Sequence, residues 1–300
     1  VRSCALENGK ATAIKQTIRQ MATRFNIAPY DEDRDIGDLR HVLIRVGEAT
    51  GETLVALVTS KKDFPHKADF VSSIHQKNPF VTTIVQIINR QDTNMVIPEN
   101  AEEFVLFGKG YITDIICGLK FIISAKSFFQ TNQKQTERLY SIAMEMARLR
   151  PTDRVLDAYS GTGTIGLIAA SYGVKEVVGV ESNSCAVKDA IKNAENNSIT
   201  NATFVNADAS KYLKNAKKEG EKFDIIFLDP PRSGSDEEFL AAASKVDAEG
   251  IVYISCNPET LSRDLRYLTR FTPYCVLEIQ PVDMFPGSSH VETVVLMSRK

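Results

Sequence analysis

The hydrophobic pattern of the chain changes near residue 125. Upstream of that point, apolar residues recur at helical spacing in 9–27 and 64–77, and β-branched runs such as 53–59 are typical of strands. Downstream, a long helical segment at about 132–149 precedes short apolar runs that alternate with helical segments. This change predicts two domains of different architecture.

The first domain, 1–125, is predicted to be α+β. Its strand-like segments 41–48 and 53–59 are separated only by Ala-Thr-Gly-Glu, which favours a β-hairpin. Hairpins beside helices indicate an antiparallel sheet that is covered on one side.

The second domain, 126–300, is predicted to be α/β, a Rossmann-like domain with a mostly parallel, doubly wound sheet. Its apolar runs alternate with segments of helical pattern, as parallel strands alternate with crossover helices. No helical segment separates the last strand-like runs, 274–282 and 291–298, so we expect the sheet to end in an antiparallel hairpin.

A glycine-rich turn, Gly161-Thr-Gly-Thr-Ile-Gly166, follows the first strand of the second domain. Such a turn brings free backbone N–H groups close to a ligand, but the pattern alone would also fit a dinucleotide. Asp157, Glu181 and Asp208 stand at the ends of three successive strands. An acid at each place suits a sulfonium, a ribose and an adenine better than a pyrophosphate. S-adenosylmethionine is therefore the predicted cofactor, and the alternative is a plain turn with helix-capping acids.

Cys256 ends the fifth strand of this domain and precedes a helix that starts at Pro258. The dipole of that helix is expected to stabilise a thiolate. Asp229, in Asp-Pro-Pro-Arg, ends the fourth strand, where it faces both cofactor and substrate or merely caps a helix. A nucleophile opposite a methyl donor is what methylation at C5 of uracil would require. A thiolate added at C6 activates C5 for the methyl group, and a base then removes the C5 proton. Glu292 is the candidate base, although an exposed edge-strand Glu is the simpler reading from the residues alone.

Further substrate contacts are predicted on both sides of these residues. Phe128, in Ser-Phe-Phe-Gln-Thr-Asn, is placed to stack on an extruded base, and Gln130 to bind cofactor or base. Paired aromatic residues at a domain junction are more often core residues. Arg232 and His290 complete the predicted substrate site.

Together these motifs resemble the RNA uracil-5-methyltransferase family. The matching segments are 127–132, 155–167, 229–234, 255–264 and 284–293, with Glu181 between the second and the third. The resemblance implies methyl transfer from S-adenosylmethionine to C5 of a flipped uridine in structured RNA, with 23S ribosomal RNA expected ahead of tRNA. It implies that Cys256 is the nucleophile and Glu292 the base. It also implies cofactor or base contacts from Gln130, Tyr159, Gly161, Thr164, Glu181, Asp208 and Asp229.

The sequence departs from the family at its N-terminal end. The small RNA-binding β-barrel of the family is missing, and the chain starts at Val1, so we expect a fragment. The family architecture also leaves open whether the helix at 9–27 packs on the catalytic domain. With a net charge of −2, any basic RNA-binding face is expected to be a local patch, or part of the RNA binding lies elsewhere.

The cysteines and the hydropathy indicate which metal sites and which cellular location to expect. The five cysteines form no closely spaced pair, so no metal site or iron–sulfur cluster is expected. No apolar run has the length of a membrane span and no signal peptide opens the chain, so a cytoplasmic protein without membrane contact is expected. We favour a monomer. The cysteines are Cys4, Cys117, Cys185, Cys256 and Cys275.

Other functions fit less of the sequence. RNA cytosine-5-methyltransferases carry a cysteine directly after the proline of the fourth-strand motif, and adenine-N6 enzymes an aromatic residue after Pro-Pro, where this chain has Arg232. A nicotinamide dehydrogenase leaves Ser-Cys-Asn-Pro and Asp-Pro-Pro-Arg without a role. A non-catalytic RNA-binding protein with the same fold remains an alternative, and it predicts that Cys256 is dispensable.

Overall fold

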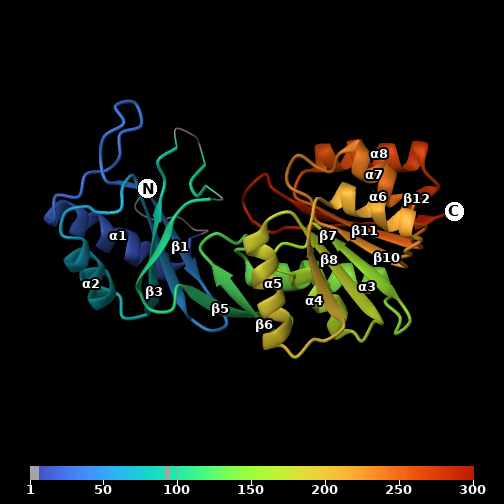
Figure 1. The fold of residues 1–300 in the computed structure, drawn as a ribbon, viewed down its shortest axis with the longest axis horizontal. Coiled ribbons are helices and arrows are strands. Elements are labelled where there is room, and N and C mark those ends of the chain that lie inside the picture. Colours follow the sequence, from blue (N-terminus) through green and yellow to red (C-terminus); the bar gives the residue numbers. More distant parts are fainter. Residues whose placement is uncertain (1–6, 92–94, 99) are drawn as a thin grey trace. The chain divides into compact units, whose positions relative to one another are not determined.

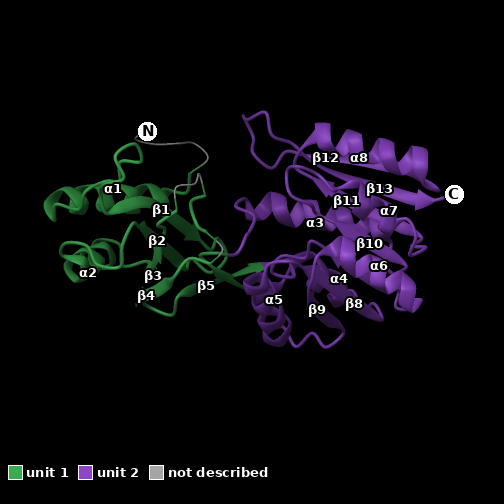
Figure 2. Ribbon diagram, turned by 45° about the horizontal axis from the view of Figure 1, so that its top comes forward, with its two compact units in different colours: residues 1–115, 122–126 green, residues 116–121, 127–300 purple. Residues whose placement is uncertain are grey.

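The computed structural model of the chain describes residues 7–91, 95–98 and 100–300 (Figure 1). It divides into two compact units (Figure 2). Unit 1 comprises 1–115 and 122–126, and unit 2 comprises 116–121 and 127–300. The observed division therefore falls within the last hairpin before residue 125, whose tip belongs to unit 2.

Unit 1 is built on a four-stranded sheet in the order β1-β2-β3-β4. The strands are β1 (Leu39–Val46), β2 (Thr53–Thr59), β3 (Val81–Ile88) and β4 (Glu103–Phe107). The hairpin β1–β2 is confirmed, but β2 and β3 are parallel, so the prediction of an antiparallel sheet is wrong. The reason is the helix α2 (Lys67–Lys77) between them, which carries the chain back to the start of the sheet as a parallel pair requires.

The helix α1 (Gly9–Arg24) packs on α2 within unit 1. Its buried residues Ile14, Ile18 and Met21 share a core with Phe70 and Ile74 of α2 and with β-branched residues of the sheet. The apolar stripe that predicted this helix is thus used inside unit 1, where a sheet face needs cover.

A two-stranded ribbon, β5 (Tyr111–Ile116) and β6 (Leu119–Ser124), follows the four-stranded sheet. Its turn is held by side chains of unit 2. The amide of Cys117 donates to Glu137 at 3.0 Å, and Lys120 exchanges two backbone bonds with the Asn197 side chain, at 2.8 and 2.7 Å. Gly118 supplies the positive φ that the turn needs.

Unit 2 is an α/β/α sandwich on a seven-stranded sheet in the order β12-β13-β11-β10-β7-β8-β9. This is the predicted mixed, mostly parallel sheet. The strands are β7 (Arg154–Ala158), β8 (Glu176–Glu181), β9 (Ala202–Asn206), β10 (Ile225–Leu228), β11 (Gly250–Ser255), β12 (Tyr274–Val282) and β13 (Glu292–Arg299).

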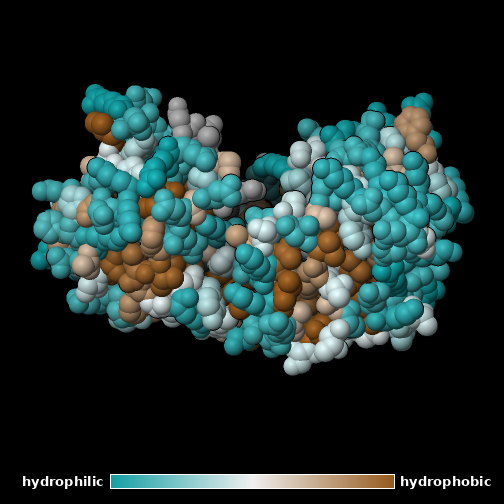
Figure 3. Space-filling model, in the orientation of Figure 1, coloured by the Kyte–Doolittle hydropathy of each residue, from teal (hydrophilic) through white to brown (hydrophobic). Residues whose placement is uncertain are grey.

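Helices cover both faces of this sheet. On one face α3 and α4 build an apolar core with the strands, and on the other face α6, α7 and α8 do so. The surface over α6 and α8 is mainly hydrophilic (Figure 3), as expected for helices that bury one side only. The helices are α3 (Gln133–Ala147), α4 (Thr164–Ser171), α5 (Ser184–Asn196), α6 (Ala209–Glu219), α7 (Glu237–Ala243) and α8 (Pro258–Phe271).

The terminal hairpin is antiparallel, as predicted, and its two strands differ in position. β13 lies between β11 and β12 and pairs antiparallel with both, whereas β12 forms the sheet edge. Glu292, the first residue of β13, is therefore on an interior strand and is only 6% exposed. The reading of Glu292 as an exposed edge-strand residue is wrong.

Candidate active site

The predicted chemical groups lie at one edge of the sheet. Successive strand residues alternate between its faces, and the residues of the core shared with α3 and α4 set the parity. Val155, Val177, Phe227, Val252 and Val294 all belong to that core. Counting along each strand in steps of two leads from them to Asp157, Glu181, Asp229, Cys256 and Glu292. All five therefore continue the same face, at the carboxyl ends of the parallel strands and at the start of β13.

The strand order brings Asp157 and Asp229 together. β7 and β10 are neighbours, and the chain runs outward from β7 toward β9 on one side and from β10 toward β11 on the other. A crevice forms beyond the strands at such a switch point and is the usual ligand site of an open α/β sheet. Asp157 is the penultimate residue of β7 and Asp229 follows β10 directly, so both carboxyl groups border this place.

Cys256 and Glu292 meet through the antiparallel pair β11–β13. The register pairs Ser255 with Thr293, so the next residues along, Cys256 and Glu292, occupy opposing positions. The negative charges of Glu292 and Asp229 both act on the Cys256 thiol. The predicted nucleophile, the predicted base and the fourth-strand acid are thus brought together by the fold.

Burial raises the pKa values of the acids in this cluster. The pKa of Asp157 rises to about 8 because the carboxyl is buried and because Asp229 and Glu181 add negative charge, against one backbone hydrogen bond from Gly166. The pKa of Asp229 rises to about 7 through desolvation and the charge of Glu292. Burial also raises the pKa of Glu292, as a base that accepts a proton near neutral pH requires.

The pKa of the Cys256 thiol is raised as well, contrary to the expected effect of the helix dipole. Burial and the charges of Glu292 and Asp229 raise it, whereas a backbone hydrogen bond at Cys256 and the Arg232 guanidinium lower it by smaller amounts. Asn257, and not Cys256, is the N-cap of α8, and its side chain accepts from the Glu259 amide at 3.0 Å. The Glu259 amide in the first turn of α8 therefore donates to Asn257.

The glycine turn between β7 and α4 is held by acids on both sides. Asp157 accepts from the Gly166 amide at 2.7 Å, and Glu181 accepts from the Gly161 amide at 3.0 Å. The second oxygen of Asp157 is buried and has no hydrogen-bond partner. Tyr159 has a φ of 65°, rare for a side-chain-bearing residue, and its ring packs on Phe239 at 5.2 Å.

Two residues that the sequence analysis missed support this turn from behind. A Cβ atom on Gly163 or Gly179 would meet the Phe204 ring at 2.7 and 2.4 Å, so the β9 ring lies directly against both glycines. Asn193 of α5, fully buried, donates to the Thr162 carbonyl at 3.0 Å. The only signals in the sequence were an Asn within a helical segment and an aromatic residue within a strand-like run.

Tyr140 of α3 is a third missed residue. The side chain is 4% exposed. Burial raises the pKa of its phenol well above the usual range, and the charges of Asp229, Asp157 and Glu292 raise it further. A neutral hydroxyl therefore lies among the acids of the cluster. Its only signal in the sequence was its place on the apolar stripe of the long helix.

The remaining predicted cofactor residues are more exposed or make fewer contacts. Asp208 is exposed and caps α6, with one oxygen accepting from the Lys211 amide at 2.9 Å, so the capping reading accounts for that oxygen. Thr164 is the first residue of α4, and its hydroxyl is 3.3 Å from that of Thr162. Gln130 is half-buried in the irregular segment before α3.

The predicted substrate residues lie on three segments. Phe128 is 73% exposed, so its ring is free for stacking, whereas its neighbour Phe129 packs on the core at Phe121. An Arg232 guanidinium nitrogen is 3.1 Å from Nδ1 of His290, so two of the predicted substrate residues contact each other. Both side chains are exposed.

Comparisons with known proteins show the family of the chain. The family model of tRNA (Uracil-5-)-methyltransferases matches residues 83–300. The chain belongs to this family. The chain is 40% identical to an uncharacterised RNA methyltransferase of Halalkalibacterium halodurans over 297 residues. It is 43% identical to another from Lactobacillus johnsonii over 282 residues.

The first match covers 99% of this chain and 64% of the relative, and the second covers 94% of this chain and 62% of the relative. The crystal structure of Pyrococcus abyssi tRNA (uracil-54, C5)-methyltransferase, in complex with S-adenosyl-L-homocysteine, superimposes with a TM-score of 0.81 at 27% identity. That match covers 99% of this chain and 69% of the other. The M. jannaschii tRNA m1G37 methyltransferase, with a TM-score of 0.54 at 15% identity over 95% of this chain and 79% of its own, shares the fold.

Two further observations concern metals and membranes. Within residues 7–91, 95–98 and 100–300, no three His, Cys, Asp or Glu side chains are grouped so as to hold a metal ion. No helix in the described part of the chain is long and apolar enough to span a membrane. Cys4 lies outside the described residues.

Proposed function

We propose that this chain carries the catalytic part of an enzyme that methylates C5 of a uridine in RNA, with S-adenosylmethionine as the methyl donor. One observation carries the proposal: Cys256 opposes Glu292 across β11 and β13, at the sheet edge that also holds Asp157 and Asp229. Family membership supports the same reaction. A nicotinamide dehydrogenase and a non-catalytic RNA-binding protein give no role to this opposed pair.

The cofactor end fits a cationic donor. Asp157 keeps one buried oxygen without a partner, at the position where the glycine turn opens, and a positive sulfonium or ammonium group would satisfy it. Such a charge would also draw the Asp157 proton away, because an adjacent cation lowers a carboxyl pKa. Glu181 and Asp208 are proposed to hold the ribose and the adenine, with Gln130, Tyr159, Gly161 and Thr164 completing the pocket. S-adenosylmethionine supplies the electrophilic methyl group.

The substrate end follows from the opposed pair. The Cys256 thiolate adds to C6 of uracil, which places electron density on C5 and makes that carbon nucleophilic. Once C5 has accepted the methyl group, Glu292 takes the C5 proton and the C6–sulfur bond breaks, which restores the double bond and the thiolate. Asp229 is proposed to contact both ligands, and Arg232, His290 and Phe128 the RNA. The target base must leave its stack, because C6 is shielded there.

The substrate is proposed to be a uridine in a structured RNA, with 23S ribosomal RNA expected ahead of tRNA. The names of the family and of the archaeal neighbour include tRNA, so both pools belong in the test. The protein is expected to act as a monomer in the cytoplasm.

The decisive experiment uses RNA that contains 5-fluorouridine. The full-length protein is incubated with S-adenosylmethionine and 5-fluorouridine-labelled rRNA or tRNA, and covalent protein–RNA species are measured by intact mass. Fluorine at C5 cannot be removed as a proton, so the adduct stops after methyl transfer. An adduct with wild type that is lost in Cys256→Ala supports the proposal. The absence of any adduct with both RNA pools would contradict uracil-C5 chemistry.

A further inference from the structure

The segment after β10 is held by hydrogen bonds from the helix α8 and its N-cap residue. We call residues 230–235, which include Arg232, the Arg232 loop. At its near end the Arg232 carbonyl accepts from the Asn257 side chain at 3.2 Å and from the Thr260 hydroxyl at 3.3 Å. Both donors lie at the start of α8, immediately after Cys256. The helix that follows Cys256 therefore also holds the loop that carries Arg232, whose positive charge acts on the Cys256 thiol.

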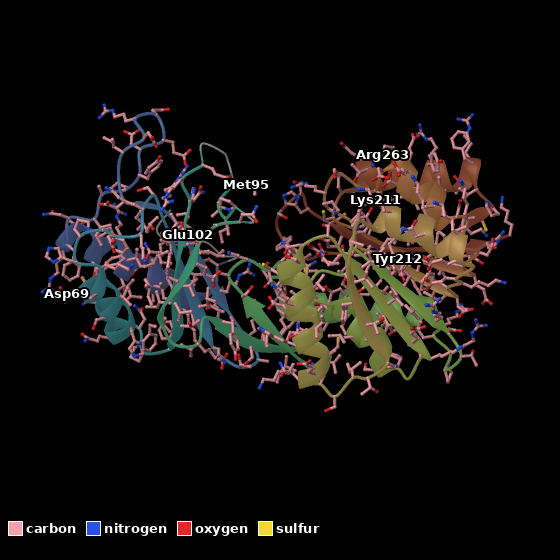
Figure 4. All side chains as sticks on the ribbon, viewed as in Figure 1. Asp69, Met95, Glu102, Lys211, Tyr212 and Arg263 are labelled. Carbon is pink, nitrogen blue, oxygen red and sulfur yellow. The ribbon has the colours of Figure 1, made fainter. Side chains whose placement is uncertain are left out.

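The far end of the Arg232 loop is held by the next turn of α8. Arg263, labelled in Figure 4, donates through one guanidinium nitrogen to the carbonyls of Ser233 and Ser235, each at 3.0 Å. The same arginine pairs with Asp264 at 2.8 Å. A guanidinium with several donors in a fixed plane is suited to holding a carboxylate and two carbonyls at once.

Asp264 connects the loop to the strand that carries Cys256. Its Oδ2 atom accepts from the Ser235 amide at 2.8 Å and from the Tyr253 hydroxyl at 2.7 Å. Tyr253 belongs to β11, and its side chain is fully buried. The Asp264 side chain is 1% exposed. One buried oxygen atom thus joins the Arg232 loop to β11, and a buried charge with satisfied partners is costly to disturb.

The contact between loop and helix leaves no spare room. Gly234 has a φ of 76°, and a Cβ atom there would lie 2.6 Å from both the Arg263 guanidinium and Asp264 Oδ2. The loop must therefore pass its backbone directly over the ion pair. Its position relative to α8, and hence to Cys256, is fixed at Arg232, Gly234 and Ser235.

We propose that Asp264, together with Arg263, is a positioning residue that fixes the Arg232 loop against the strand of Cys256 and so sets the reactivity of the Cys256 thiol. Its bearing on methyl transfer rests on the proposed function, whereas the contacts do not. Three charged groups act on the thiol: Glu292 from β13, Asp229 from the end of β10 and Arg232 from the loop. Of these three charges only that of Arg232 favours the thiolate, beside a backbone hydrogen bond at Cys256 that does not depend on the loop, so the two acids gain weight when the loop moves away.

The test measures alkylation of Cys256 by iodoacetamide across a range of pH, with peptide mass spectrometry on the full-length protein. Alkylation needs neither RNA nor S-adenosylmethionine, so the outcome is independent of the proposed function. We expect Asp264→Ala to move the midpoint of the alkylation profile to higher pH, and to slow alkylation at about pH 7.5 roughly threefold. The exposed Cys185 in the same sample is the internal control and keeps its rate.

Matched variants separate positioning from general destabilisation. Asp153 is also a buried aspartate paired with a nearby arginine, Arg150 at 2.8 Å, but it precedes β7 at the opposite edge of the sheet. Asp153→Asn is expected to lower Tm without moving the Cys256 profile. Asp264→Asn keeps an acceptor for Ser235 and Tyr253 and should recover part of the rate.

The route through Arg232 is tested by a double variant. Arg232→Ala alone should slow alkylation of Cys256, and adding Asp264→Ala to it should cause no further change. Should Asp264→Ala not fold, Arg263→Ala is the substitute, because that side chain is 56% exposed and its removal should move the profile in the same direction. An unchanged profile in a folded variant, or full additivity with Arg232→Ala, would overturn the proposal.

Discussion

The side-chain amide of Asn132 donates to the carbonyl of Met284 at 2.9 Å. Asn132 is also the N-cap of α3, and its oxygen accepts from the Gln135 amide at 3.3 Å. One side chain therefore ties the segment that carries Phe128 and Gln130 to the loop that leads into His290 and Glu292. Met284 itself is fully buried, so the tether has a firm anchor.

Loss of the Asn132–Met284 hydrogen bond should reduce turnover strongly while lowering the free energy of unfolding only modestly. We expect Asn132→Ala to lower the free energy of unfolding by about 1 kcal/mol, as for other N-caps, and to reduce methyl transfer because the loop before Glu292 is released. Asn8→Ala removes the N-cap of α1 in unit 1 and is the matched control. Chemical denaturation and turnover are measured on both, and equal turnover would contradict the tether.

Replacing the base should stop the reaction after methyl transfer. Glu292→Gln keeps the shape of the side chain but cannot take the C5 proton, so kcat should fall by about 10²- to 10⁴-fold. A covalent adduct with unmodified RNA should accumulate, seen as a shifted band on a denaturing gel. Glu259→Gln, exposed in the first turn of α8, is the control and should turn over like wild type. Normal turnover in Glu292→Gln would assign the base elsewhere.

The buried carboxyl of Asp157 predicts a pH-dependent stability. Its pKa is about 8 in the folded protein against an ordinary value of 3.8, so the folded state holds the proton more tightly than the unfolded state. This contribution to stability is present below about pH 4 and is lost as the pH rises to about 8. At about pH 4 the free energy of unfolding of Asp157→Asn should therefore equal that of wild type. At about pH 8 it should be higher than that of wild type by roughly 2–4 kcal/mol.

Thermal unfolding at both pH values checks this prediction. Asp114 of unit 1 is a suitable comparison, because its buried carboxylate accepts from the amides of Glu48, Ala49 and Thr50 at 3.0, 3.0 and 3.3 Å. Asp114→Asn should lose stability at about pH 8, since a carboxylate with several donors is replaced. A stability gain of Asp157→Asn that does not depend on pH would show that the carboxyl is not the cause.

The Phe204 ring should link strand packing to cofactor binding. In Gly179→Ala the new Cβ atom would be 2.4 Å from that ring, which must move and with it the support of Gly163. We expect a loss of about 1–3 kcal/mol in stability and a several-fold weaker Kd for S-adenosylhomocysteine. In Gly250→Ala the new Cβ atom comes closest to the end of the Ile225 side chain, at 3.0 Å, far from the turn. Calorimetric titration should find its Kd unchanged, and an unchanged Kd in Gly179→Ala would refute the link.

Local signals in the sequence were sufficient for most elements of unit 2. The strand at Tyr274–Val282 and the helix that starts at Pro258 coincide with their predicted positions, because a regular alternation of apolar runs and helices leaves little choice. Unit 1 was harder. The strand Glu103–Phe107 was not predicted, and the pair β2–β3 was expected to be antiparallel. Both depend on which strand lies beside which, and propensity says little about that.

The sequence by itself determined which residues end the strands, and thereby the chemical types available: a cysteine, several acids and a glycine turn. The tertiary structure decided their neighbours. Cys256 meets Glu292 only because β13 pairs with β11 inside the sheet, and that pairing then determines that the acid is buried and that its pKa rises. The tertiary structure also decided that the Asn257 side chain accepts from the Glu259 amide of α8 and that the charge of Arg232 acts on the thiol. Strand order and burial arise from contacts between distant segments, so a local pattern cannot encode them.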